Sequence, residues 1–337
     1  MSASQVRDKR QARRTIGLIA GTALSLLSLA LVVRGVAWGE VARTLARTSP
    51  LHVALAILSY AASVWAKAER WRLLFYPRHR QMRLGKLASI YLIGSMANVW
   101  LLSHAGELAR AYLVGRIERT NTAGALGTLV LERAFESVVL LASLGLLGLF
   151  MPLPGWLQTS SLLLSGLLAV VLAALLLAAY QRERTIAWGE ALARRAPWLN
   201  RWRISERLIA VSRGLEGLGR LDVDAGLLGW SLLAWVIAAL TNLFALRAVG
   251  IHLPWYAPLF LLVVFSIGAV VPASPGRLGV FHYLTVQSLA FFGVAREPAL
   301  GFAIVLHLVV YVLPGLAGAI CLWRENYALQ RAQGGEP

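Results

Sequence analysis

The sequence predicts an all-α integral membrane protein that crosses the bilayer several times. Of its 337 residues, 58% are hydrophobic and only 15% are charged, and the mean hydropathy is +0.65. Soluble globular domains have about a quarter of their residues charged. Several uncharged runs are about as long as the roughly 20 residues that cross a hydrocarbon core. Basic residues gather between these runs, which is typical of cytoplasmic loops.

The formal net charge is +17, which in a soluble protein would indicate nucleic acid. The sequence has no zinc-finger spacing and no RNA-binding signature, so we expect no nucleic-acid partner. We expect the basic loops to contact anionic lipids instead. Cys321 is the only cysteine, which excludes an internal disulfide. No nucleotide-binding or zinc-protease motif occurs. We therefore expect no cofactor, no metal and no enzymatic activity.

The basic clusters set the predicted topology. The N-terminus (residues 1–14), the segment 67–86 with seven Lys/Arg and the segment 182–220 with nine arginines are placed in the cytoplasm. We read the first apolar run as a retained span rather than a signal peptide. Six full spans are expected, at about 15–37, 49–66, 122–150, 156–180, 226–249 and 298–323. This gives one transmembrane domain (15–325) in the plasma (bacterial inner) membrane, with a cytoplasmic tail (326–337).

Two further segments are predicted to be re-entrant hairpins. A full crossing at Leu87–Gly106 would move the nine-arginine loop outside, so we expect this segment to turn near Ser103–Gly106 and return to the cytoplasm. The second hairpin, about 255–293, enters from outside and turns at Pro272–Gly279. This topology places 26 of the 33 Lys/Arg in the cytoplasm. Eight full spans would fit the charge distribution less well.

Each hairpin is followed by a long span that opens with Ala-Leu-Gly, at 125–127 and at 299–301. The units 87–150 and 255–323 therefore predict an inverted repeat. Paired, interrupted segments of this kind indicate a transport site near the middle of the membrane. The alternative is a chance match, since Ala, Leu and Gly are abundant here.

The hairpin turns contain residues that disfavour a continuous helix, because proline lacks an amide donor and glycine allows tight turns. Irregular backbone at membrane depth needs cover from protein or water. These turns therefore indicate a cavity, or else a packed helix break that binds nothing. The turn residues are Ser103, Gly106, Pro272, Ser274, Pro275, Gly276 and Gly279.

Ionisable residues inside membrane segments are functional candidates by default. Glu132 and Glu136 share one helix face. With Arg133 they either contact a substrate or form a structural ion-pair network. Glu107 and Arg110 either pair locally or line the inner mouth of a cavity. The substrate-binding candidates are Glu107, Arg110, Glu132, Arg133, Glu136, Arg277, His282 and His307.

Arg277, His282 and His307 each leave alternatives open. Arg277 would pair with a membrane acid, hold a lipid phosphate, or extend to the membrane surface. The two histidines would relay protons or pack as neutral rings. Metal binding is disfavoured because no acid or cysteine cluster accompanies them. Finally, the loop 181–225 carries an apolar stripe at helical spacing with flanking arginines, which predicts an amphipathic helix on the membrane surface.

Three motifs resemble the flippase-like family, which is also called the lysylphosphatidylglycerol synthase transmembrane region. They are GELARAYLVGR (106–116), LVLER (129–133) and PASPGRLGV (272–280). The resemblance covers about residues 15–325. It implies re-entrant segments and the movement of lipids or lipid-linked head groups between leaflets. The family's Gly-Glu…Arg, Glu-Arg and Pro-Gly-Gly-x-Gly elements fall on Gly106–Arg110, Glu132–Arg133 and Pro275–Gly279.

The sequence departs from the family pattern at three positions. Arg277 stands where the second turn glycine is usual, His282 near a frequent glutamate, and His307 near a frequent arginine. The sequence shows no counterpart of the family's cytosolic aminoacyl-transfer domain, so we do not expect this chain to make lysyl-lipid by itself. The expected function is lipid transport through a polar groove between the hairpins, with a phospholipid or a lipid-linked substrate as partner and the oligomeric state open. The alternatives are an enzyme or accessory subunit that acts on lipid-linked sugars, and a scaffold.

Overall fold

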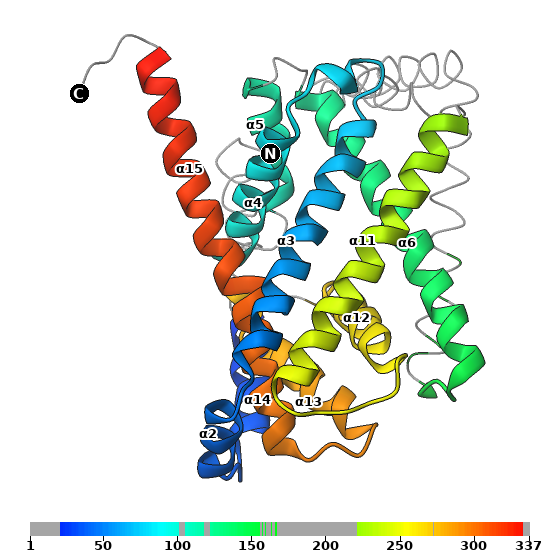
Figure 1. Cartoon of the computed structure of the whole chain (residues 1–337), viewed down its shortest axis with the longest axis vertical. Helices are drawn as coiled ribbons and strands as arrows, with labels where there is room; N and C mark the ends of the chain where they lie inside the picture. The colour runs from blue at the N-terminus through cyan, green and yellow to red at the C-terminus, as the bar shows by residue number, and fades with distance from the viewer. Residues whose placement is uncertain are drawn as a thin grey trace, which may run out of the picture. The chain divides into compact units, whose positions relative to one another are not determined.

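The computed structural model describes residues 21–100, 105–117, 122–155, 157, 159, 163, 166, 221–271 and 273–332. All regular structure in these residues is helical, which confirms the predicted all-α class (Figure 1). The α-helices that carry labels are α2 (Trp38–Ala46), α3 (Pro50–Leu73), α4 (Leu84–Trp100), α5 (Ala105–Ile117), α6 (Thr122–Phe150), α11 (Leu221–Ala248), α12 (Ala257–Gly268), α13 (Val280–Ala290), α14 (Arg296–His307) and α15 (Leu313–Ala332). Short 3-10 helices cover Arg78–Gln81 and Pro275–Arg277, and a π-helix covers Leu308–Val312.

Four helical stretches are long and apolar enough to cross a membrane. They are Pro50–Leu73, Gly127–Phe150, Asp222–Ala248 and Arg296–Glu325, and each overlaps a predicted span. A fifth candidate is a bent pair, Gly21–Val33 and α2, whose axes meet at 88°. The predicted span 156–180 and loop 181–225 lie almost wholly outside the described residues. The chain is therefore a multi-pass membrane protein in which four to five of the predicted spans are described.

Contacts divide the chain into two compact units. Unit 1 comprises Met1–Ala61, Leu92–Gly106 and Ala238–Pro337, and unit 2 comprises Ala62–Tyr91 and Glu107–Ile237. Each unit has its own buried apolar cluster. The cluster of unit 1 includes Val41, Leu246, Leu261, Phe281, Leu289, Phe302 and Leu306. The cluster of unit 2 includes Ala68, Trp71, Leu87, Ile90, Ala111, Val114, Leu129 and Leu227.

In unit 1, α12 and α13 form the second predicted hairpin. The ring of Phe260, early in α12, lies 5.7 Å from Phe291 just after α13, and Phe265 lies 4.8 Å from Phe281. Early residues of one helix thus contact late residues of the other, so the helices are antiparallel. The chain turns between them through the 3-10 helix Pro275–Arg277. The turn therefore lies where proline and glycine were predicted to place it.

The turn depends on left-handed backbone at Gly276 (φ 70°), Arg277 (φ 55°) and Gly279 (φ 87°). Glycine adopts such angles without penalty, whereas a residue with a Cβ is strained by about 1–2 kcal/mol. A Cβ on Gly279 would also overlap the carbonyl oxygen of Ser25. A glycine would therefore suit position 277, and Arg277 holds its left-handed backbone angle at a cost in strain.

The helices α4 and α5 form the first predicted hairpin. The amide of Gly106 donates to Oδ1 of Asn98 at 2.8 Å in unit 1. In unit 2 the guanidinium of Arg110 lies 4.7 Å from the ring of Tyr91. Each of these two contacts joins α4 to α5 within one unit. A Cβ on Gly106 would overlap the carbonyl oxygen of Gly94, so this close approach requires glycine. Ser103 lies outside the described residues.

Both Ala-Leu-Gly tripeptides lie in the first two turns of a long helix. Ala125 in α6 and Ala299 in α14 are buried. The order hairpin-then-helix is thus the same in the two halves of the sequence. The inverted relation of the two halves stays a prediction.

Candidate functional site

Six charged side chains form one ion-pair network inside unit 2. They come from α3, α5 and α6, two of which are candidate membrane spans. The members are Arg70, Glu107, Arg110, Glu132, Arg133 and Glu136. Five of these six residues were predicted as candidates from the sequence, and we call the set the charge network.

Glu132 lies at the buried end of the charge network. One of its carboxylate oxygens accepts from Nη2 of Arg70 at 2.8 Å, and the other accepts from Nη2 of Arg110 at 2.7 Å. The side chains of Arg70, Glu132 and Arg110 are only 1%, 5% and 9% exposed. Charges taken out of water are stable only when they are paired. Glu132 therefore compensates two buried guanidinium groups at once.

The network continues from Arg70 to its exposed end. Nη2 of Arg70 also donates to Glu136 at 2.8 Å, and Glu136 accepts in turn from Nη1 of Arg133 at 2.9 Å. Nη2 of Arg133 donates to Glu107 at 2.5 Å. The side chain of Arg133 is 62% exposed, whereas Glu136 and Glu107 are largely buried. The network thus extends from a fully buried arginine to one that is open to its surroundings.

Two aromatic rings contact the buried arginine of α5. The guanidinium of Arg110 lies 4.2 Å from the ring of Trp71 and 4.7 Å from that of Tyr91. Both distances are within the range of a cation–π interaction. Nε1 of Trp71 donates to the hydroxyl of Thr128 at 3.0 Å. These contacts position Arg110 toward Glu132.

Some polar atoms of the network have no hydrogen-bond partner in the described structure. They are Nε of Arg70, Nε of Arg110 and Oε2 of Glu107, all of which are buried. The formal charges balance, with three guanidinium groups and three carboxylates. An anion that reaches Arg133 must therefore compete with a carboxylate that is already bound, and Glu107 is the partner with an unused oxygen.

The pairing differs from the sequence expectation in two respects. Glu107 and Arg110, three residues apart, do not pair with each other, because each binds a residue of α6 instead. Arg70 was assigned to a cytoplasmic loop, but α3 continues to Leu73 and buries it. The sequence did carry a signal for this, since the buried Val64, Ala68 and Trp71 continue a helical spacing of four and three beyond the predicted end.

In unit 1, Arg277 stabilises the end of α12. Its guanidinium donates to the carbonyl of Ala269 at 3.0 Å and also to that of Gly268. Unpaired carbonyls at the end of a helix require such donors. Among the described residues no carboxylate lies within ion-pair distance of Arg277. The predicted acid partner is therefore not found there, and binding of a lipid phosphate by Arg277 stays a prediction.

His282 and His307 pack against each other in unit 1, with ring centroids 5.2 Å apart. Nε2 of His307 donates to the carbonyl of Gly276 at 2.8 Å, and its ring stacks on Tyr311 in the π-helix. Nδ1 of His282 is buried without a hydrogen-bond partner. The described residues contain no group of three metal-binding side chains. The packing role is therefore observed, and the proton relay stays a prediction.

The remaining turn residues also lie in unit 1. The amide of Ser274 donates to the hydroxyl of Ser25 at 2.8 Å, which ties the turn to the helix Gly21–Val33. Pro275 begins the 3-10 helix, and Pro272 lies outside the described residues. The predicted candidates therefore form two groups. One is the charge network of unit 2, and the other comprises Arg277, His282 and His307 in unit 1.

Comparison with known proteins places these residues in a family context. The pattern of the family "Lysylphosphatidylglycerol synthase TM region" matches residues 18–318. Two UPF0104 membrane proteins of Methanothermobacter thermautotrophicus are similar, at 26% and 20% identity. They align with 92% and 89% of this chain, and the alignment covers 93% of each relative.

A third relative is the protein named glycosyltransferase AglD of Haloferax volcanii. It is 24% identical over 95% of this chain, and the match covers 56% of its own length. No solved structure matches the chain. Both groups of candidate residues fall inside the matched region.

Proposed function

Because the chain belongs to the family of the lysylphosphatidylglycerol synthase transmembrane region, we propose that it moves a phospholipid or a lipid-linked head group between membrane leaflets. The observation that supports this proposal is the charge network of unit 2. It combines buried, paired charges with one exposed arginine in helices that are long enough to span a membrane. Charged groups in such helices commonly mark substrate pathways.

Arg133 is the proposed contact for an anionic head group. An arginine binds phosphate through two parallel hydrogen bonds, as it binds a carboxylate. A lipid phosphate can therefore replace Glu107 on Arg133 without leaving the guanidinium unpaired. Glu107, once displaced, is available to an amine on the head group. The acyl chains stay in lipid throughout, so only the head group requires a polar path.

Arg110 and Arg70 have a different part in this proposal. Both are buried and both share Glu132, so they hold the α6 carboxylates in place while Arg133 exchanges partners. No residue in this scheme forms a covalent bond to the lipid.

The test is lipid movement by the purified protein in liposomes. Fluorescent phosphatidylglycerol is incorporated in both leaflets, and dithionite then bleaches the label that reaches the outer leaflet. We expect the wild type to expose the label of the inner leaflet, and we expect Arg133→Gln to abolish this. Arg116→Gln is the matched control, because Arg116 is an exposed arginine of α5 that pairs with no described residue. Equal rates for the two variants would refute the role of Arg133.

A second function is favoured by one relative. The protein named glycosyltransferase AglD matches almost the whole of this chain, so an enzyme or accessory subunit that acts on a lipid-linked sugar is the alternative. The same purified protein is incubated with a dolichol- or undecaprenyl-linked sugar. Release or transfer of the sugar without any lipid movement would replace the transport proposal with this one.

A further inference from the structure

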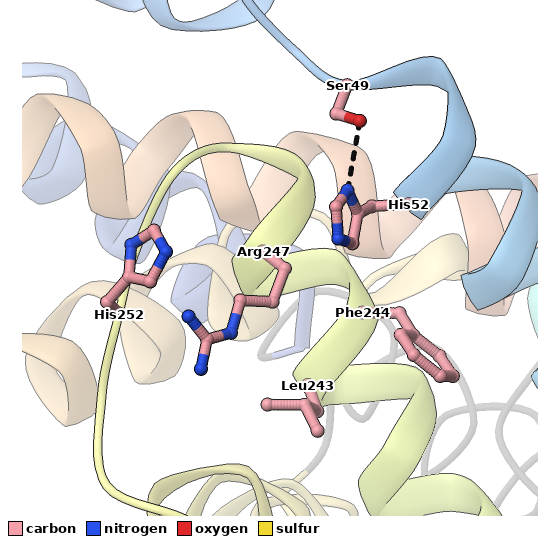
Figure 2. A pocket seen from close by; sticks show the side chains of 6 residues that line it. All are labelled: Ser49, His52, Leu243, Phe244, Arg247 and His252. Carbon is pink, nitrogen blue, oxygen red and sulfur yellow. Dashed lines mark hydrogen bonds between the residues drawn. The ribbon is translucent and has the colours of Figure 1, made fainter.

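An open pocket of about 470 Å³ lies in unit 1, away from the charge network in the sequence and in a different unit. Three segments line it: the start of α3, the end of α11 and the connection that follows α11. The lining residues are Ser49, His52, Leu243, Phe244, Arg247 and His252. In Figure 2, the side chain of Arg247 lies between those of His52 and His252.

The backbone around the pocket is held by hydrogen bonds. The amide of Ser49 donates to the carbonyl of Ala248 at 2.8 Å, which ties the start of α3 to the end of α11. The amide of Ile251 donates to the carbonyl of Leu246 at 2.9 Å, and Gly250 turns the chain with a φ of 77°. These bonds fix the three lining segments relative to one another, so the pocket is a feature of the folded backbone.

The polar side chains that line the pocket are those of Ser49, His52, Arg247 and His252. None of the six lining residues is acidic. Within the described part of the chain, the guanidinium of Arg247 forms neither an ion pair nor a hydrogen bond. An arginine in a membrane segment is normally paired. Its positive charge is therefore available to a ligand from outside the chain.

The two histidines each present hydrogen-bonding capacity to the pocket. Nδ1–H of His252 donates to the carbonyl of Gly250 at 3.0 Å, so Nε2 of the neutral ring is an acceptor and His252 adds contact area rather than a donor. Nδ1 of His52 lies 2.9 Å from the hydroxyl of Ser49 (Figure 2). If the hydroxyl donates, Nε2–H of His52 remains a donor. If Nδ1–H donates instead, the hydroxyl proton of Ser49 remains. Either tautomer leaves one donor beside Arg247.

Leu243 and Phe244 form the apolar part of the lining. An anion that binds here can therefore contact a guanidinium, one further donor from the Ser49–His52 pair, and hydrocarbon. A phosphate ester suits this combination, because its several oxygens accept from more than one direction and its ester group carries the apolar part. We propose that this pocket binds the phosphate group of a phosphate ester, with Arg247 as its main contact.

Such an ester has two sources, a membrane lipid or a soluble metabolite, and they share the phosphate. The predicted topology places this end of α3 and α11 on the outer side of the membrane. Binding at this pocket does not require that the protein transports lipid. The proposal is therefore independent of the charge network, and its test is an equilibrium measurement on the full-length protein.

The test uses protection of His252 from diethyl pyrocarbonate, read for each histidine by mass spectrometry. Two probes carry the same phosphate: glycerol 3-phosphate, and dihexanoyl phosphatidic acid for the lipid source. His79 of unit 2 is the internal control, since it lies outside the pocket. We expect at least one probe to protect His252 and to leave His79 unchanged.

Arg247→Gln should weaken the protection about tenfold or more, since a charge-assisted hydrogen bond contributes about 1.5–3 kcal/mol. Arg47→Gln, an exposed arginine at the end of α2, should leave it unchanged. If the Gln variant does not fold, Arg247→Lys takes its place. Lysine keeps the charge without the two-pronged geometry, so protection of His252 should be weaker than in the wild type but not lost.

The probes decide the source of the phosphate. Protection by phosphatidic acid alone identifies a lipid ligand, and equal protection by glycerol 3-phosphate identifies a soluble one. Absence of protection by both probes would overturn the proposal. Equal protection in the wild type and Arg247→Gln would also overturn it, because Arg247 would then have no part in binding.

Discussion

Replacement of Glu132 by glutamine is the most informative single change to the charge network. Among the described residues, Glu132 is the one carboxylate within ion-pair distance of Arg110. Arg70 also loses a partner, but it keeps Glu136 at 2.8 Å. The substitution therefore leaves one buried guanidinium without a counter-charge, while the shape of the side chain is retained.

The magnitude follows from this count of partners. Removal of one member of a buried ion pair costs about 3–5 kcal/mol, because the remaining charge is stranded. The contacts of Arg110 with the rings of Trp71 and Tyr91 are present before and after the substitution, so they do not change this difference. We therefore expect Glu132→Gln to lower the free energy of unfolding by about 3–5 kcal/mol. The double variant Glu132→Gln/Arg110→Gln should recover to within about 1 kcal/mol of the wild type, because no unpaired charge remains.

The assay is unfolding in mixed micelles with increasing denaturing detergent, followed by circular dichroism. Glu69→Gln is the matched control, because Glu69 pairs with Arg72 at 2.8 Å in a partly exposed position. Such a pair contributes about 0–1 kcal/mol. The reasoning fails if Glu132→Gln is no more damaging than Glu69→Gln. It also fails if the double variant is as unstable as the single one.

Three further predictions concern the turns and the aromatic support. Gly279→Ala should lower the free energy of unfolding by more than about 2 kcal/mol, because it adds overlap with Ser25 to the backbone strain. Gly293 is the control, because it has a φ of 74° but no neighbour within 4 Å. Gly293→Ala should therefore lower the free energy of unfolding by only about 1–2 kcal/mol. Arg277→Gly should be about 1 kcal/mol more stable than Arg277→Ala, since both lose the guanidinium and only alanine keeps the strain; thermal unfolding in detergent compares them, and the reverse order would contradict the strain argument. Trp71→Phe should cost about 1 kcal/mol through the lost hydrogen bond to Thr128, and Trp71→Phe/Thr128→Val should cost little more than Trp71→Phe in the same detergent titration; an additive loss would show that the bond is not the cause.

The sequence predicted which of the described segments form helices and where the second hairpin turns, because both depend on local properties. Apolar runs set the spans, and Pro275, Gly276 and Gly279 set the second turn. The antiparallel packing of α12 on α13 then agrees with the expectation. The helix α3 continues about two turns beyond the predicted end of its span, whereas the basic residues after position 66 were assigned to a loop. Arg70 lies within this helix and is neutralised there by Glu132 and Glu136.

The partners within the charge network could not be read from the sequence. Helical spacing placed Glu132 and Glu136 on one face, and the structure agrees. Which arginines face them depends on how α3, α5 and α6 pack, and this is set by contacts between distant residues. The same holds for Arg277, whose partners are backbone carbonyls, a class of contact that carries no signature in the side chains.

The initial rate of phosphatidylglycerol movement in a double-variant comparison of Glu107 and Arg133 tests the central claim most directly. If Arg133 exchanges Glu107 for a lipid phosphate, Arg133→Gln stops transport, and Glu107→Gln/Arg133→Gln stays equally inactive. If the Arg133–Glu107 pair at 2.5 Å is only structural, Arg133→Gln impairs transport because it leaves Glu107 without a partner. Removal of both charges would then restore transport. Recovery of transport in the double variant would therefore contradict the account.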